Sequence, residues 1–364
     1  MTIYIVLVIF CLCLAFAELF YFNNKTLSTK NRIENLCLCI IAVILILVAT
    51  LRSDDVGIDT ATYHNWFQSY ENKDFVDIKK IGFLDEPGFA FLNIAFNKMN
   101  LGWGAFKFFS ACIYIIPFLI ILKKYSLHPL VSVLLFVLGG GYFFIFSTLR
   151  QGIGLGFVFI AFLLSKRKTI VLSLVFYLIA ITIHSTCIVF ILFYLAMLIA
   201  LHNTKHLVVW LICGLFAAVI GAILLRTSLL NYALAILHKD YKIDESTGGY
   251  LTLLFYLGML FVFCIFTNKS DKNDFILNNS KILKLFLLTI TFFPIVAFSP
   301  SVFRILMYFS FACDIFLVNA CCYLKEKNTK IIVSAVFFAA YVYLFVFTMM
   351  IPSKGLIPYT IFNL

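Results

Sequence analysis

The sequence predicts an all-α, polytopic integral membrane protein with about twelve transmembrane helices, and three observations support this. Of the 364 residues, 63% are hydrophobic and only 12% are charged, whereas a soluble domain is about half apolar and a quarter charged. The mean hydropathy is +1.05. The apolar residues also form runs of about 15 to 22, a length at which a helix crosses the hydrocarbon core of a bilayer.

The individual spans follow from the apolar runs that charged residues bound. In chain order we expect them at 3–22, 35–51, 105–122, 130–147, 149–164, 169–183, 185–201, 207–225, 250–267, 282–299, 303–323 and 331–350. Losing the short span at 169–183 would invert the topology after it, but the charges on both sides favour keeping it. We expect residues 1–364 to form a single transmembrane domain.

The positive residues predict which loops are cytoplasmic. If the loops at 23–34, 123–129, 165–168, 202–206, 268–284 and 324–330 lie inside, they contain 16 of the 28 Lys and Arg but only 4 of the 17 acids. The outer side then holds 12 basic and 11 acidic residues, which satisfies the positive-inside rule. Both termini are therefore expected outside, and the net charge of +11 reflects topology and does not indicate a nucleic-acid partner.

Two predicted extracytoplasmic (periplasmic) segments are long enough for chemistry, 52–104 and 226–249. The first contains an apolar stretch at 88–96 that is too short to span, which predicts a re-entrant or interfacial helix beginning after Pro87. The alternative is a surface helix lying on the bilayer. We therefore expect short interfacial helices in an outer-face loop region.

Several kinds of site are disfavoured by composition. The eleven cysteines lie in or beside apolar runs, where cysteine behaves as a small hydrophobe, so neither disulfides nor a metal site is expected. No phosphate-binding loop for a nucleotide is present, and we predict no cofactor. The spans contain only two acids, Glu18 and Asp314, whereas an ion-coupled transporter would normally need more ionisable groups at the midplane.

Four arginines each lie at or beside the outer end of a predicted span: Arg52, Arg150, Arg226 and Arg304. A guanidinium binds phosphate oxygens at two points, and a charge-assisted bond contributes about 1.5–3 kcal/mol. The alternative is that these side chains reach ordinary phospholipid headgroups. A phosphate-binding role is favoured for Arg150, because this residue lies in a very short polar connection between two spans. The glycines that follow it, Gly152 and Gly156, predict close approach of another helix.

Proton-transfer candidates also lie on the outer side. Asp59 and Tyr63 are four residues apart, and Trp66 follows them, which combines a carboxylate with aromatic faces suited to sugars. Glu86 precedes the predicted interfacial helix, and its alternative role is to stabilise the start of that helix. His184 lies in an outer turn, where an imidazole can accept a proton near neutral pH, or simply cap the turn.

Several ordered motifs resemble the EpsG family of bacterial polysaccharide polymerases, which are similar in role to the Wzy O-antigen polymerases. The motifs are Gly57-Ile58-Asp59-Thr60, Glu86-Pro87-Gly88-Phe89, Leu149-Arg150-Gln151-Gly152, Ile183-His184-Ser185, Phe303-Arg304 with Tyr308, and Ile357-Pro358-Tyr359. Each motif alone is weak, but the set is spread in order from about residue 50 to 360.

The resemblance implies a GT-C-like glycosyltransferase in the bacterial cytoplasmic (inner) membrane, with its active site facing the periplasm or cell exterior. It implies that undecaprenyl-pyrophosphate-linked oligosaccharides are joined into O-antigen, capsule or exopolysaccharide. Membrane lipids, a chain-length regulator and a flippase would be partners. The alternatives are a lipid-linked oligosaccharide flippase or exporter, and another polyprenyl-donor glycosyltransferase or ligase.

The same resemblance assigns roles to the residues above. The arginines would bind the donor pyrophosphate, with Arg150 and Arg304 aided by Arg52 or Arg226. The general base is left open among Asp59, Glu86 and His184. The expected sugar or phosphate contacts are Tyr63, Trp66, Gln151 and Tyr308. No metal is expected, because arginine can replace a divalent ion at a pyrophosphate.

Overall fold

The computed structural model describes residues 1–22, 25–198, 258–259, 280–291, 303–351 and 355–361. The predicted loop at 226–249, with Arg226, and the predicted span at 207–225 lie outside these residues. Within the described part the protein is all-α, apart from an isolated antiparallel bridge between Arg52 and Ile361. The chain divides into two compact units, Met1–Ile188 with Tyr341–Leu364, and Val189–Ala340.

Five of the described helices are long and apolar enough to cross a membrane. They are α1 (Thr2–Phe20), α2 (Leu27–Leu51), α5 (Trp103–Tyr125), α15 (Phe303–Tyr323) and α16 (Lys327–Met350). Each corresponds to a predicted span. The protein is therefore a multi-pass membrane protein, as the sequence predicts.

The shorter apolar helices depart from the predicted spans in two places. The span predicted at 130–147 is interrupted, because α6 (Pro129–Leu138) is followed by three glycines before α7 (Phe144–Ser147) begins. Glycine is a weak helix former, and the Tyr114 hydroxyl donates a 2.7 Å hydrogen bond to the Gly141 carbonyl inside the break. The span predicted from 185 begins as a 3-10 helix, η5 (Ser185–Phe190), before α10 (Ile191–Leu198).

The first unit is built around α8 (Leu149–Leu164), which packs between α5 and α9 (Ile170–Ile183). The predicted close approach at Gly156 is confirmed, since a Cβ there would lie 2.3 Å from the Ile113 carbonyl oxygen of α5. Helix α2 packs on α5, and α1 packs on α6.

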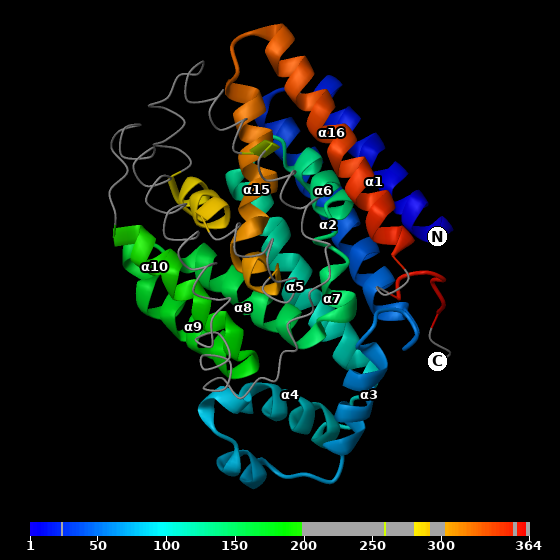
Figure 1. The fold of residues 1–364 in the computed structure, drawn as a ribbon, viewed down its shortest axis with the longest axis vertical. Helices are drawn as coiled ribbons and strands as arrows, with labels where there is room; N and C mark the ends of the chain where they lie inside the picture. Colours follow the sequence, from blue (N-terminus) through cyan, green and yellow to red (C-terminus); the bar gives the residue numbers. More distant parts are fainter. Residues whose placement is uncertain (23–24, 199–257, 260–279, 292–302, 352–354, 362–364) are drawn as a thin grey trace, which may run out of the picture. The chain divides into compact units, whose positions relative to one another are not determined.

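The segment 52–102 closes one end of this unit, which we call the α3–α4 end (Figure 1). It contains α3 (Thr60–Ser69), the 3-10 turns η2 (Phe75–Lys80) and η3 (Phe83–Asp85), and α4 (Pro87–Lys98). Helix α4 begins at Pro87, one residue before the predicted start, because proline at the first helical position lacks only a hydrogen that would have no partner in the helix.

The C-terminal segment 355–361 is tied to the α3–α4 end. The Ser53 amide donates to the Thr360 carbonyl and the Gly57 amide to the Gly355 carbonyl, both at 2.8 Å. The Tyr359 hydroxyl donates to the Val48 carbonyl at 2.9 Å. The backbone bonds hold residues 53–57 against the C-terminal segment, and the Tyr359 bond ties that segment to α2.

The second unit contains α10, a helix at 280–291, α15 and the first part of α16. The rings of Phe286 and Phe316 stack with their centroids 3.8 Å apart, and those of Phe190 and Phe309 at 6.2 Å. Its core is therefore strongly aromatic.

Candidate active site

Glu86 is held in an uncommon backbone conformation at the start of α4. Its φ and ψ of 66° and 50° lie in the left-handed region, which a residue other than glycine occupies at a cost of about 1–3 kcal/mol. Its carbonyl accepts the first hydrogen bonds of α4, from the amides of Phe89 and Ala90. The side chain is 5% exposed. Such a strained, buried carboxylate is a feature of functional sites.

The Glu86 carboxylate joins a histidine from one element to an arginine from another. Its Oε1 accepts a 2.8 Å hydrogen bond from His184 Nδ1, and it lies 3.2 Å from the Ser185 amide nitrogen and 3.3 Å from the Ser185 hydroxyl. Its Oε2 forms an ion pair with the guanidinium of Arg150. We call these three residues, Glu86, Arg150 and His184, the Glu–Arg–His cluster.

Close packing of α4 on α9 brings Glu86 to His184. A Cβ on Gly88 would lie 2.3 Å from the Thr182 hydroxyl, so only glycine allows this approach. His184 follows the last residue of α9 and precedes η5. Arg150 comes from the first turn of α8, which lies beside α9. The cluster therefore depends on three helix ends that meet at the α3–α4 end.

Arg150 is partly exposed and lies against aromatic rings. Its guanidinium carbon is 5.0 Å from the centre of the Trp66 ring and 5.7 Å from that of Phe89. The side chain is 27% exposed; its Nε is buried and has no hydrogen-bond partner among the described residues, so the exposed terminal nitrogens are the donors that can meet a ligand. A guanidinium offers five donors, so Arg150 can bind an oxyanion while it contacts Glu86.

The two proton-transfer candidates in the cluster, Glu86 and His184, have different surroundings. An ionised carboxylate only accepts hydrogen bonds, so the His184 Nδ1 carries the hydrogen toward Glu86 and Nε2 is the acceptor nitrogen of the neutral ring. Glu86 pairs with the guanidinium of Arg150, and its Oε1 faces three donors, which are His184 Nδ1 and the amide and hydroxyl of Ser185. The arrangement resembles a carboxylate that orients a histidine base.

The charges of the cluster also extend to the end of α3. Burial raises the pKa of Tyr70, the residue that follows α3, while the positive charge of Arg150 opposes this and the negative charge of Glu86 adds to it. Tyr70 therefore lies within electrostatic reach of the cluster.

Asp59 does not join the cluster. It precedes α3, and among the described residues its carboxylate forms no hydrogen bond or ion pair. Tyr63 and Trp66 lie about one and two turns further along, with their ring centroids 5.3 Å apart, and both contact the Phe89 ring. Trp66 is thus brought to Arg150, and Tyr63 supports it from the buried side. Gln151 is 3% exposed next to Arg150.

Arg52 is placed elsewhere. Its side chain is 1% exposed, its guanidinium donates to the Ala49 carbonyl, and its central carbon lies 4.7 Å from the centre of the Phe146 ring. Burial lowers its pKa to about 10, which still leaves it charged at neutral pH. The Lys107 ammonium donates to the Arg52 carbonyl at 2.6 Å. The structure therefore does not bring Arg52 to the Glu–Arg–His cluster.

Arg304 and Tyr308 belong to the second unit. Arg304 is exposed at the start of α15, and Tyr308 is fully buried one turn later. Their contribution to pyrophosphate and sugar binding stays a prediction, as does that of Arg226. Among the described residues, no group of three or more metal-ligating side chains lies together.

The sequence interpretation missed a second carboxylate–histidine pair. The Asp54 carboxylate accepts a 2.6 Å hydrogen bond from His64 Nδ1 and a 2.8 Å hydrogen bond from Trp103 Nε1. The His64 and Trp103 rings are stacked, with their centroids 5.1 Å apart and their planes at an angle of 2°. Asp54 was one of many acids in the loop, and no spacing in the sequence links it to Trp103, 49 residues away.

Comparison with known proteins identifies the family. The model of the EpsG family matches residues 35–361. The chain belongs to the EpsG family. No curated protein and no solved structure matches it. The EpsG family is associated with exopolysaccharide biosynthesis, and the resemblance drawn from the motifs is thereby confirmed. In this EpsG-family protein, three of those motifs supply Glu86, Arg150 and His184.

Proposed function

We propose that this EpsG-family protein is a polysaccharide polymerase, a glycosyltransferase that joins undecaprenyl-pyrophosphate-linked oligosaccharide repeat units into O-antigen, capsule or exopolysaccharide. The observation that supports the proposal is the Glu–Arg–His cluster. It places a cation with unused donors beside a carboxylate-oriented histidine, at an end of a membrane protein where a lipid-linked substrate would arrive.

The cluster suits the chemistry of sugar transfer from a pyrophosphate. A hydroxyl of the acceptor attacks the anomeric carbon of the donor, a new C–O bond forms, and the bond from that carbon to the pyrophosphate oxygen breaks. The proton of the hydroxyl goes to His184 Nε2, and undecaprenyl pyrophosphate leaves with the bonding electrons. Arg150 stabilises the negative charge that develops on this leaving group, and Glu86 orients the histidine.

We also propose which end of the protein faces the cytoplasm. In the first unit, the helix ends opposite the α3–α4 end carry Lys123 and Lys124, and the connection between α8 and α9 carries Lys166, Arg167 and Lys168. The α3–α4 end mixes acids with bases. By the positive-inside rule the basic end is cytoplasmic. We therefore propose a bacterial inner-membrane protein with about twelve spans and a GT-C-like fold, whose cluster faces the periplasm or cell exterior.

The partners follow from the reaction. The substrates are undecaprenyl-pyrophosphate-linked oligosaccharides in a membrane of ordinary lipids, and a flippase of the same pathway must deliver them to the outer leaflet. A chain-length regulator is a further proposed partner.

The test supplies lipid-linked repeat units to the purified protein in lipid nanodiscs and separates the products by length. A polymerase gives a ladder of longer chains. Arg150→Lys should lower the elongation rate about 10²-fold, because an ammonium cannot contact Glu86 and bind pyrophosphate at two points. Arg167→Lys, an exposed arginine of the α8–α9 connection, is the matched control and should elongate normally.

Two results would contradict the proposal. In proteoliposomes, transfer of intact substrate across the bilayer without elongation would identify a flippase or exporter. Transfer of a single glycan to a different acceptor would identify another glycosyltransferase or a ligase.

A further inference from the structure

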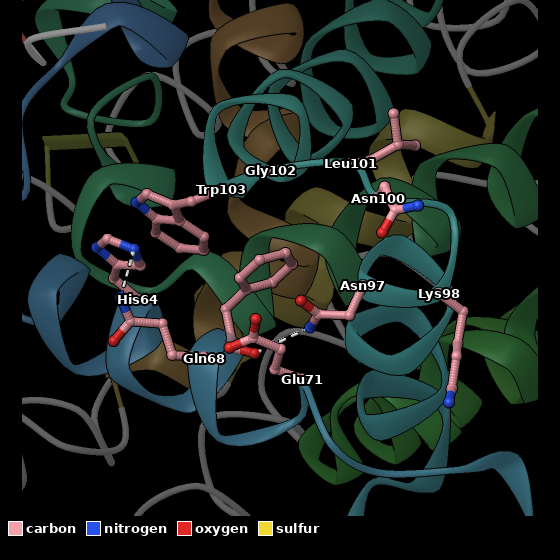
Figure 2. A pocket seen from close by; sticks show the side chains of 10 residues that line it. His64, Gln68, Glu71, Asn97, Lys98, Asn100, Leu101, Gly102 and Trp103 are labelled. Atoms are coloured by element: carbon pink, nitrogen blue, oxygen red, sulfur yellow. Dashed lines mark hydrogen bonds between the residues drawn. The ribbon is translucent and has the colours of Figure 1, made fainter.

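A polar cavity lies at the α3–α4 end, between α3, the end of α4 and the start of α5. Its volume is about 510 Å³, within the range of roughly 300–1,000 Å³ typical of small-molecule sites. Figure 2 shows His64, Gln68 and Glu71 on one side and Asn97 and Asn100 on the other. None of these five side chains belongs to the Glu–Arg–His cluster.

The lining offers both donors and acceptors of hydrogen bonds. Gln68, Asn97 and Asn100 supply amides. The Asn97 Nδ2 donates to the carbonyls of Phe67 and Asn93, each at 3.0 Å, so its two hydrogens are used and its oxygen is an acceptor held in place. Among the described residues, the Glu71 carboxylate forms no hydrogen bond or ion pair. Such a mixture matches hydroxyl groups, which both donate and accept.

One wall of the cavity is fixed before any ligand arrives. Asp54 holds His64 through Nδ1 at 2.6 Å and holds Trp103 through Nε1 at 2.8 Å. The opposite ring nitrogen of His64 lies 3.4 Å from Gln68 Nε2. The rings of His64 and Trp103 are stacked, so neither can rotate without breaking these contacts. Preorganised groups of this kind lower the entropy lost on binding.

The charges of the lining select against a phosphate. Among the described residues that line the cavity, Lys98 is the one lysine or arginine, and it is paired with Asp74. Glu71 would repel an anion from the other side. A lipid tail is disfavoured because polar side chains, which are the three amides with His64, Glu71 and Lys98, form most of the lining. An uncharged, hydroxyl-rich ligand fits best.

We infer that this cavity binds a sugar residue of the glycan chain, as a subsite separated from the Glu–Arg–His cluster by α3. The inference rests on the proposed function for the identity of the glycan. Helix α3 is the shared wall, since His64 and Gln68 face the cavity and Trp66, on the same helix, contacts Arg150. A chain whose reacting end lies at Arg150 can place a more distant sugar in the cavity.

The experiment measures binding without catalysis. The probe is the lipid-free oligosaccharide obtained by cleaving the host's own surface polysaccharide to repeat units, and its binding to the full-length protein in nanodiscs is followed by saturation-transfer NMR. Gln68→Ala and Asn100→Gly remove one amide each; glycine keeps the positive φ of 55° at residue 100. Each variant should raise the Kd about 3- to 10-fold, as expected for one lost hydrogen bond.

The controls separate the cavity from the cluster. Asn65→Ala removes an exposed amide of α3 that does not line the cavity and should leave the Kd unchanged. Thermal unfolding of all variants should match that of the wild type. A Kd that is unchanged in both cavity variants, or no binding by the wild type, would overturn the inference.

The elongation assay distinguishes this failure from that of the proposed function. If the cavity variants weaken binding but the wild type elongates nothing, the sugar site stands and the polymerase proposal fails. If the wild type elongates while binding depends on Arg150 but not on Gln68 or Asn100, the polymerase stands and the cavity inference fails.

Discussion

The ion pair between Glu86 and Arg150 can be tested by a double-mutant cycle. In Glu86→Gln, the amide oxygen can replace Oε1 and keep the contacts with His184 and Ser185. The amide nitrogen then replaces Oε2 and faces the Arg150 guanidinium, donor against donor. The substitution therefore preserves the histidine side of the cluster and breaks the arginine side. Arg150→Gln removes the other partner, and the double variant removes both.

The structure sets the expected size of the coupling. Two unit charges about 4 Å apart attract by about 4 kcal/mol at an effective dielectric constant near 20. Because Arg150 is 27% exposed, solvent screening reduces the expected coupling to about 1–3 kcal/mol. The double variant should thus be more stable than the sum of the two single effects predicts, since each single variant leaves one charged group, buried Glu86 or partly exposed Arg150, without its partner.

The assay is denaturant titration of the purified proteins in detergent micelles, which gives a free energy of unfolding for each variant. Asp55→Asn, an exposed carboxylate of the same segment, provides a parallel cycle with Arg150→Gln that should be additive within about 0.5 kcal/mol. Elongation should fall about 10²-fold in either single variant and no further in the double variant, because the residues act as a unit. A coupling below about 0.5 kcal/mol, or normal elongation by Glu86→Gln, would refute the reasoning.

Two further predictions follow from the packing and from the candidate base. His184→Ala should lower the elongation rate by about 10²- to 10⁴-fold at an unchanged protein level, whereas Asp59→Asn should retain most activity because Asp59 lies outside the cluster; the opposite pattern would assign the base to Asp59. Gly156→Ala should destabilise the protein by about 1–3 kcal/mol, because the new Cβ would lie 2.3 Å from a backbone oxygen of α5. Gly104→Ala, where a Cβ meets nothing within 4 Å, is the control for thermal unfolding, and equal melting temperatures would contradict the packing argument.

Hydropathy predicted the long helices well because their signal is local. A run of about twenty apolar residues is sufficient evidence for α1, α2, α5, α15 and α16. The break in the span predicted at 130–147 was missed, because the three glycines lie in an apolar run and no charged residue marks the end of the helix there. What decides its conformation is a hydrogen bond to the Gly141 carbonyl from α5, 27 residues away in sequence, and hydropathy contains no information on such a partner.

The sequence was enough to name the residues of the candidate site, but not to say which of them contact one another. Arg150 and His184 stood out from apolar surroundings, Glu86 marked the start of the predicted interfacial helix, and the structure brings these three together. In the sequence, Asp59 was an equally good candidate for the general base, and Arg52 was an equally good candidate for binding pyrophosphate at the end of a span. Their separation from the cluster depends on side-chain direction and burial, since the Arg52 guanidinium turns back toward Ala49. A sequence motif does not determine these features.

The motif around Asp59 has a structural explanation that connects it to the site. The Thr60 hydroxyl lies 2.8 Å from the Val56 carbonyl oxygen and 2.9 Å from that of Phe146, which immediately precedes the polar connection to Arg150. The Ile58 amide donates to the Ser147 hydroxyl at 3.3 Å. These bonds join the start of α3 and the residues before it to the end of α7, two residues before α8 begins. Because Trp66 lies on α3 and Arg150 follows α7 on α8, the same bonds help to hold the ring beside the guanidinium. This motif therefore acts by positioning, whereas the motifs at Glu86, Arg150 and His184 supply the groups that carry the proposed chemistry.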